Sequence, residues 1–231
     1  MEIEEVAAAT EVRPSYRRMI SEFLGTAILL LTVVGSGIQA TLLSPHDIGL
    51  ELLENALATA AILYLIITVF AKESGAHFNP LVTFFSATKG ELTSKQAIIE
   101  VVLQFSGAIL GTITANSMFG VPITHLSNHI RQSSPHFLSE VIATFLLITV
   151  IELAGKTYDA RAVPALVATL IGAAYFFTSS TSFANPAAVV GRMFTNSFAG
   201  ISPSSSISFI IAEIIGASGG YLFSKIFKSK G

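Results

Sequence analysis

Six long apolar stretches constrain the fold of this chain more than any other feature of its sequence. They cover about residues 20–42, 52–71, 97–119, 137–154, 163–180 and 206–227. A bilayer core about 30 Å thick is crossed by a helix of roughly 20 apolar residues, so each stretch is long enough to span a membrane. Together they take up more than half of the 231 residues. The sequence therefore predicts an all-α membrane protein with six transmembrane helices.

The supply of charge excludes several other classes of protein. Only 12% of the residues are charged, whereas a soluble domain has about a quarter. The net charge of −2 offers no basic surface for a nucleic acid. The chain has no cysteine, which excludes disulfides, thiol catalysis and thiolate metal sites. We therefore expect membrane lipid as the surroundings and no nucleic-acid partner. The predicted spans also bring no serine–histidine pair to matching membrane depths, so no enzymatic activity is expected.

The basic residues lie mostly on one side of the predicted spans. That side carries Arg13, Arg17, Arg18, Lys72, Lys89, Lys95, Lys156, Arg161, Lys225, Lys228 and Lys230, and the other side has only Arg131 and Arg192. Cytoplasmic loops carry the excess of lysine and arginine, so both termini are predicted to be cytoplasmic, in a plasma or bacterial inner membrane. Residues 1–18 then form a cytoplasmic tail. They lack the basic start and cleavage site of a signal peptide, so the first span is predicted to be retained.

Two connections between spans are too long for turns. Residues 72–96 and 181–205 each include an apolar piece of about ten residues, which is half of what a span needs and fits a re-entrant half-helix. Each piece follows an Asn-Pro pair, in Asn79-Pro80-Leu81 and in Asn185-Pro186-Ala187. Asparagine is a favoured N-cap and proline a favoured first helical residue. Each pair is therefore predicted to begin a short helix.

The two halves of the chain repeat each other. Glu22 opens the first span as Glu140 opens the fourth, and Gln104 in the third span matches Glu213 in the sixth. With three spans in each half, the second copy must be inverted in the membrane, and such repeats build a path for solutes where their broken helices meet. We expect one domain over residues 19–228, with halves of about 19–119 and 137–227. Glu213 is given no role by this comparison.

Two Asn-Pro boxes 106 residues apart, inside a duplicated frame of six spans, resemble the aquaporin (major intrinsic protein) family over about residues 18–227. The resemblance implies six spans plus two re-entrant half-helices, a homotetramer with one pore in each protomer, and no cofactor. It also implies that Asn79 and Asn185 cap the half-helices and donate hydrogen bonds to the permeant. Glu22 and Glu140 would accept hydrogen bonds from the amides of the re-entrant loops. Leu81 departs from the family, which usually has alanine there.

Selectivity in this family is set by four side chains, and gapless counting from the two boxes places them at Thr59, Ala173, Ser182 and Ala188. Ala188 stands where most members have arginine. Four small side chains imply a wide filter without fixed charge, and hence passage of water and of neutral solutes such as glycerol, urea, boric acid and arsenous acid. With the phrase Phe198-Ala199-Gly200-Ile201, this filter resembles the bacterial aquaglyceroporins that are associated with arsenic-resistance operons.

Some alternatives stay open at this point. Arg192, four residues after Ala188, is either a solvent-facing residue at the end of the half-helix or a side chain of the outer vestibule, where it would refill the pore and make it water-selective. An ion-coupled secondary transporter would use Glu213 as its coupling carboxylate. His77 is either structural or a proton sensor. A metal site at His125, His129 and His136 is disfavoured by their spacing.

Overall fold

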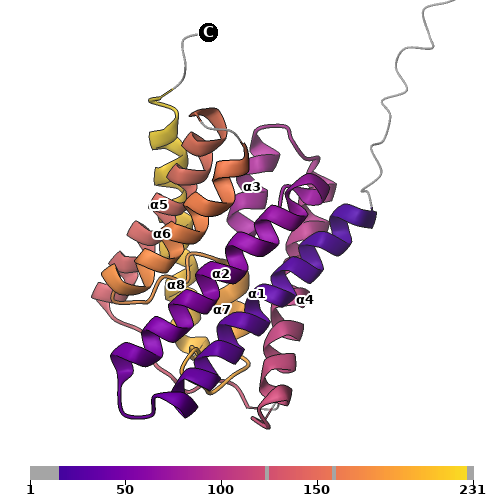
Figure 1. Cartoon of the computed structure of the whole chain (residues 1–231). Helices are drawn as coiled ribbons and strands as arrows, with labels where there is room; N and C mark the ends of the chain where they lie inside the picture. The colour runs from indigo at the N-terminus through magenta and orange to yellow at the C-terminus, as the bar shows by residue number, and fades with distance from the viewer. Residues whose placement is uncertain (1–15, 123–124, 158–159, 228–231) are drawn as a thin grey trace, which may run out of the picture.

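The computed structural model describes residues 16–122, 125–157 and 160–227. Six long helices form a bundle (Figure 1) with these bounds: α1 Tyr16–Leu43, α2 Ile48–Ser74, α4 Ser94–Met118, α5 Ser134–Thr157, α6 Val163–Phe177 and α8 Pro203–Ser224. Two short helices, α3 (Pro80–Thr88) and α7 (Pro186–Arg192), and one 3₁₀ turn (Ala160–Ala162) complete the helical elements, and no strand occurs among the described residues. The predicted all-α class with six long helices and two half-helices is confirmed.

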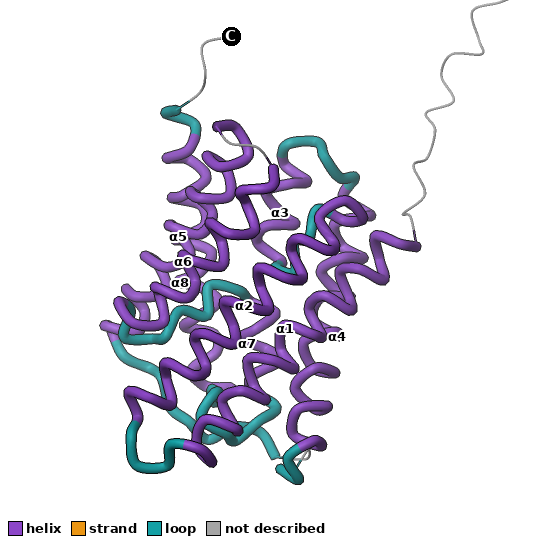
Figure 2. Tube along the Cα trace, viewed as in Figure 1, coloured by secondary structure: helices purple, strands orange, loops and turns teal. Residues whose placement is uncertain are grey.

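The helix α6 is shorter than the sequence predicts. Five of the six long helices are long and apolar enough to cross a membrane, but α6 has 15 residues, a length of about 22 Å. It ends at Phe177 because Thr178 adopts an extended conformation with ψ of 141°. The chain after Thr178 then runs from the end of the bundle into its interior, where α7 begins (Figure 2). Thr178, Ser179 and Ser180, which the sequence prediction placed at the end of a span, are polar and belong to this descent.

The helices begin and end at two faces of the bundle. We call the face at which α1 begins and α8 ends the terminal face, and the opposite one the far face (Figure 1). Following the chain back and forth places α3 in the terminal half of the bundle and α7 in the far half. The described part of the predicted basic side, with Arg17, Arg18, Lys89 and Lys225 among its members, lies toward the terminal face. Most of the tail 1–18, Lys228, Lys230 and the side chain of Lys156 lie outside the described residues.

Helix contacts repeat between the two halves. The pair α1 and α4 packs as α5 and α8 do, α1 and α2 pack as α5 and α6 do, and α2 contacts α6 across the middle. Each half-helix also packs against the last long helix of its own half, α3 on α4 and α7 on α8. The structure therefore has the inverted repeat that the sequence predicts.

Glycine permits the closest of these contacts. A Cβ atom on Gly107 of α4 would overlap the carbonyl oxygen of Phe23 in α1, and one on Gly216 of α8 would overlap that of Val141 in α5. Membrane helices use such small residues to bring their backbones together, because lipid supplies no hydrophobic force between helices. The tight packing of α4 on α1 and of α8 on α5 fixes the positions of the helices whose side chains bind the re-entrant segments.

Candidate functional site

The two half-helices begin at the asparagines of the Asn-Pro boxes. The Oδ1 atom of Asn79 accepts a hydrogen bond from the backbone N–H of Leu81 at 3.0 Å, and Oδ1 of Asn185 accepts one from Ala187 at 2.9 Å. Pro80 and Pro186 follow as the first helical residues, where their missing N–H has no partner to lose. Both boxes therefore cap and begin a helix as the sequence predicts.

Each asparagine also ties its half-helix to the other half of the chain. The Nδ2 atom of Asn79 donates to the carbonyl oxygen of Ala184 at 2.8 Å, and Nδ2 of Asn185 donates to that of Phe78 at 2.7 Å. Ala184 directly precedes Asn185, and Phe78 directly precedes Asn79. An amide nitrogen has two hydrogens, so each tie uses one hydrogen and leaves the other to donate elsewhere. The positive ends of two helix dipoles meet at this point.

The loops that lead to the boxes have a strained backbone with the same pattern. Ala76 and Phe78 have φ of 52° and 48°, and Ser182 and Ala184 have φ of 50° and 47°. Residues other than glycine rarely adopt this left-handed region. The repeat of the pattern at a spacing of 106 residues indicates that the strain is built into both halves rather than local to one.

Buried glutamates stabilise these loops. Glu22 accepts hydrogen bonds from the backbone N–H groups of His77 at 3.0 Å and Phe78 at 2.8 Å. In the other half, Glu140 accepts from Phe183 at 3.0 Å and Ala184 at 2.8 Å. Both glutamates are fully buried, so they are not solvated helix ends. Hydrogen bonds from several donors offset the cost of placing a carboxylate inside the membrane.

Glu213 supports the second box, a role that sequence reasoning missed. Its Oε1 atom accepts a hydrogen bond from the backbone N–H of Asn185 at 2.9 Å. The matching residue, Gln104, donates instead, to Glu22 and to Thr83, both at 2.8 Å. The sequence repeat matches Glu213 with Gln104, and this match is the sequence feature that could have indicated a supporting role for Glu213. This contact gives Glu213 a place in the scaffold without ion coupling.

A cavity of about 280 Å³ lies on the terminal side of the two asparagines. Asn79 and Asn185 line its inner end, and most of its wall is aliphatic, with Leu29, Leu63, Ile67, Leu147, Ile148, Ile151, Val163, Val167 and Ile171. The polar side chains His77, Ser86, Lys89, Glu91 and Glu152 also line it. The cavity is thus an apolar passage with hydrogen-bonding groups at both ends.

The four predicted filter residues lie outside this cavity lining, and the structure does not bring Ala173 to the other three. Ala173 is exposed on the surface of α6. Tyr175 is buried instead, with its hydroxyl oxygen 3.1 Å from Oγ1 of buried Thr59. Cavity-lining Ile171 is followed on the same helical face by Tyr175, four residues on. A count along the chain does not follow the helical face, because the residues after Phe177 leave the helix, and Tyr175 is therefore an alternative to Ala173 at this position.

Ser182 and Ala188 flank the second box. Both side chains are buried. The hydroxyl of Ser182 has no hydrogen-bond partner among the described residues, and Ala188 offers only a methyl group. The far side of the asparagine pair thus combines small side chains with the hydroxyls of Thr59, Tyr175 and Ser182.

Arg192 is not solvent-facing, and that sequence-based alternative is wrong. Its exposed fraction is 3%. The Nε atom donates to the carbonyl oxygen of Ala199, and the guanidinium carbon lies 3.4 Å from the centre of the Phe183 ring. The same ring has Arg131 at 5.5 Å. A cation over an aromatic face is stabilised by the charge distribution of the ring, so Arg192 is fixed next to Ser182 by two separate contacts.

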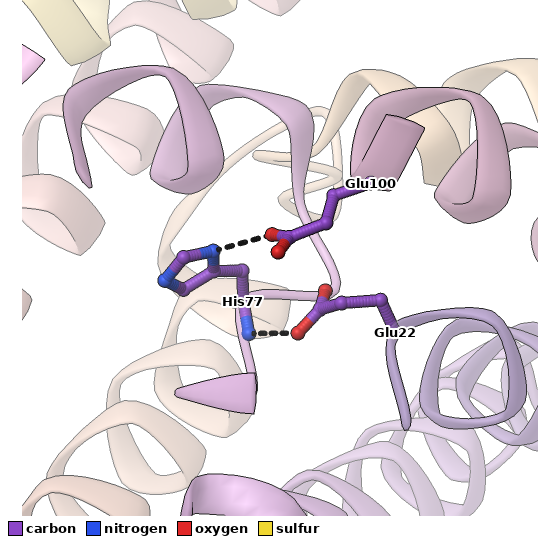
Figure 3. Close-up of side chains that lie close together, drawn as sticks. All are labelled: Glu22, His77 and Glu100. Atoms are coloured by element: carbon purple, nitrogen blue, oxygen red, sulfur yellow. Dashed lines mark hydrogen bonds and ion pairs between the residues drawn. The ribbon is translucent and has the colours of Figure 1, made fainter. Parts of the chain in front are cut away.

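Figure 3 shows a group that has the composition of a metal site. Glu22, His77 and Glu100 bring one ligand atom each to within 4.8 Å of one another. Glu22, however, has four donors on its two oxygens, because Ser74 and Gln104 add to the two loop amides. Glu100 forms an ion pair with Arg18, and Nδ1 of His77 lies 3.3 Å from Glu100. These contacts fit a structural network and do not fit a cation.

Comparison with known proteins adds to this geometry. The model of the family described as Major intrinsic protein matches residues 9–184. Aquaglyceroporin AqpS of Rhizobium meliloti (strain 1021) is 46% identical over 201 residues, which cover 87% of this chain and 85% of that protein. Aquaporin NIP1-1 of Zea mays is 29% identical over 162 residues, or 69% of this chain and 56% of the relative.

A solved structure resembles the whole bundle. The X-ray structure of the aquaglyceroporin from Plasmodium falciparum superposes with a TM-score of 0.69 and covers 92% of this chain and 95% of its own. At 20% sequence identity, this likeness concerns the fold alone.

Proposed function

Because the chain belongs to the major intrinsic protein family, it is a multi-pass membrane channel for water and small solutes, and we propose that it conducts neutral solutes as large as glycerol. The observation that carries the proposal is Ala188, a buried methyl group beside the second box where most members of the family have arginine. The 46% identity to a protein named aquaglyceroporin supports it. Urea, boric acid and arsenous acid belong to the same class of neutral solutes.

The proposed filter consists of Thr59, Tyr175, Ser182 and Ala188, with Tyr175 in place of Ala173. Because of the Tyr175 ring, this filter is narrower than the filter of four small side chains that the sequence predicts. It suits an amphipathic solute, because a carbon chain can lie against the Tyr175 ring while hydroxyl groups bond with Thr59 and Ser182. The hydroxyl of Ser182 has no protein partner among the described residues and is therefore free to bond with a permeant.

In the proposed mechanism, the permeant passes the cavity, the asparagine pair and the filter in turn. At the asparagines its oxygen accepts hydrogen bonds from the remaining amide hydrogens of Asn79 and Asn185. A water molecule held in this way cannot pass a proton along a chain of waters. The positive ends of α3 and α7 repel cations at the same point. Neutral molecules avoid both barriers.

A second candidate is a water-selective channel. Arg192 favours it, because its guanidinium is buried over the ring of Phe183, the neighbour of Ser182, and could restore the cation that Ala188 lacks. The contact with Ala199 argues against this, since it holds the guanidinium to the wall.

The test is stopped-flow light scattering on proteoliposomes exposed to a glycerol gradient and, separately, to an impermeant osmolyte. We expect rapid shrinkage followed by rapid re-swelling in glycerol. Fast shrinkage without re-swelling would leave the water-selective alternative.

The variant Ala188→Arg tests the filter itself. An arginine there should narrow the passage and add a fixed charge, so glycerol flux should fall by about tenfold or more while water flux stays within about twofold. The control variant Ala173→Leu, on the exposed face of α6, adds bulk without placing a charge in the membrane and should leave both fluxes unchanged. Glycerol flux that survives Ala188→Arg would contradict the filter assignment.

We also propose that the protein is a homotetramer with one pore in each protomer, and that its terminal face is cytoplasmic in a plasma or bacterial inner membrane. The family resemblance supports the first proposal. The basic residues of the terminal face support the second. In this arrangement residues 19–228 form one channel domain and residues 1–18 a cytoplasmic tail.

A further inference from the structure

A partly buried ion pair lies in the wall of the cavity, in the terminal half of the bundle. The Nζ atom of Lys89, just after α3, is 2.8 Å from Oε1 of Glu152 in α5 and 3.2 Å from Oε1 of Glu91. The exposed fractions of the three side chains are 28% for Lys89, 5% for Glu152 and 54% for Glu91. All three residues line the same cavity as Asn79 and Asn185. Glu152 is thus the deeply placed carboxylate of the group.

The fold does not require charge at this position. The offset of 118 residues that relates Glu22 to Glu140 relates Glu152 to Val34, which is buried and apolar. The offset of 106 between the two boxes likewise relates Lys89 to Thr195. The scaffold therefore accepts uncharged side chains at the matching places in the other half, and the pair is a feature of the terminal half alone.

Lys89 supplies a positive charge to the two carboxylates of this group. Burial lowers the pKa of its ammonium, but the carboxylates of Glu152 and Glu91 outweigh burial, and the pKa of Lys89 is raised above its ordinary value. Lys89 therefore stays charged at neutral pH. A carboxylate so paired can remain in an apolar wall, and its oxygens have several acceptor positions, more than one lysine fills.

We propose that Glu152 is a solute-binding residue of the channel, which accepts a hydrogen bond from a hydroxyl group of a neutral hydroxylated solute inside the cavity. The proposal rests on the proposed function and names a second contact point for the same solutes. The asparagines can only donate their remaining amide hydrogens, so they bind the oxygen of a hydroxyl as an acceptor. Glu152 provides the complementary acceptor for a hydroxyl hydrogen.

The aliphatic wall makes such an acceptor necessary. A polyol that leaves water loses hydrogen bonds for every hydroxyl group, and each unreplaced bond is a barrier to its passage. Leu147, Ile148 and Ile151, on the same helix as Glu152, cannot replace these bonds. A bond to an ionised acceptor is stronger than one to a neutral group. Water is smaller and keeps more of its bonds within a file of waters, so it depends less on Glu152.

The test measures glycerol binding separately from glycerol passage. Proteoliposomes contain glycerol at the same concentration inside and outside, and an impermeant sugar added outside drives water efflux. The measured quantity is the half-inhibition concentration, the glycerol concentration that halves the water flux. We expect Glu152→Gln to raise this concentration about fivefold and Glu152→Val to raise it about tenfold. Valine is chosen because Val34 occupies the matching position in the other half. Water flux without glycerol should stay within about twofold of the wild type. The matched control Glu73→Gln, an exposed carboxylate at the end of α2, should change neither quantity.

Lys89→Gln separates binding from a purely structural tie between α3 and α5. It breaks the same ion pair but keeps the carboxylate, so inhibition by glycerol should persist. If Lys89→Gln and Glu152→Gln have the same effect, or if Glu152→Gln leaves the half-inhibition concentration unchanged, the proposal is wrong. A failure of the proposed function would give a different result, because wild-type vesicles would then not re-swell in glycerol. That result does not depend on whether glycerol inhibits water efflux.

Discussion

Glu213 differs from its repeat partner by a single charge. In the first half, Glu22 has the neutral side chain of Gln104 beside it. In the second half, Glu140 has Glu213 within electrostatic reach, with Arg192 as a nearby cation. The two carboxyl groups share that region with the guanidiniums of Arg192 and Arg131, but as neighbours they repel each other when both are ionised. Burying such a pair costs free energy whether both groups are ionised or one must take up a proton.

The variant Glu213→Gln should therefore stabilise the protein. The glutamine oxygen can still accept from the N–H of Asn185, and the repulsion between the two buried carboxyl groups is gone. We expect the melting temperature in detergent, measured by the fluorescence of a bound dye, to rise by about 2–4 °C. The reverse change, Gln104→Glu, should lower it by placing a second carboxyl group beside Glu22. A lower melting temperature for Glu213→Gln would contradict this account.

Tyr175 and Ala173 decide between two readings of the filter. The Tyr175 hydroxyl lies 3.1 Å from that of Thr59, and Ala173 is exposed on the opposite side of α6. We expect Tyr175→Ala to enlarge the passage and raise the flux of urea and glycerol relative to water. Ala173→Leu should leave solute flux unchanged in the same vesicle assay. If Ala173→Leu reduces glycerol flux and Tyr175→Ala does not raise it, the gapless count from Asn185 is the correct one.

Residue-level prediction from the sequence succeeded where a residue has a partner at a fixed spacing. The asparagines and Glu140 have such partners in the other half, and the repeat points to them. Tyr175 could not be found in this way, because the residues after Phe177 leave the helix and a count along the chain does not follow the helical face. The sequence left Arg192 with two alternatives for another reason, since its partners Phe183 and Ala199 come together only in the folded loops.

At the scale of elements, backbone contact between helices makes single glycines critical. A Cβ atom on Gly216 would overlap the carbonyl oxygen of Val141, which cannot move without shifting α5, the helix that holds Glu140. Gly216→Val should cost about 3 kcal/mol of stability and reduce channel activity. A Cβ atom on Gly155, near the end of α5, would have no atom within 4 Å, so Gly155→Ala should be neutral or slightly stabilising. Melting temperatures in detergent test both, and an unaffected Gly216→Val would show that α5 and α8 can separate at little cost.

The elements themselves follow closely from apolar length, because a bilayer dictates how many residues a span needs. Predicted and observed ends agree within a few residues for most helices, as for α4, predicted at 97–119 and observed at Ser94–Met118. The largest difference at a functional position is the end of α6. The predicted span runs past Phe177 into Thr178, Ser179 and Ser180, which are polar and belong to the loop.

At the scale of the whole molecule, the inverted repeat places two half-helices head to head and ties them by reciprocal bonds. Asn79 donates to Ala184 and Asn185 donates to Phe78, so each half of the chain holds the box of the other. Both positive helix ends and both amide donors thus meet at one point on the path. In the proposed mechanism, the barrier to cations and protons therefore belongs to this meeting of the halves and to neither half alone.

Asn185→Asp tests that conclusion with little change of shape. The carboxylate can still cap α7 by accepting from Ala187, but it cannot donate to Phe78 or to a permeant, and its charge offsets the positive helix ends. We expect proton influx into proteoliposomes, followed with a trapped pH dye under a potassium diffusion potential, to rise about tenfold or more, which corresponds to about 1.4 kcal/mol of lost barrier. By symmetry Asn79→Asp should act alike, whereas Ala173→Leu, away from the path, should show no leak. A proton flux that stays at the wild-type level while water flux persists would mean that the barrier resides elsewhere, with the filter around Tyr175 as its place.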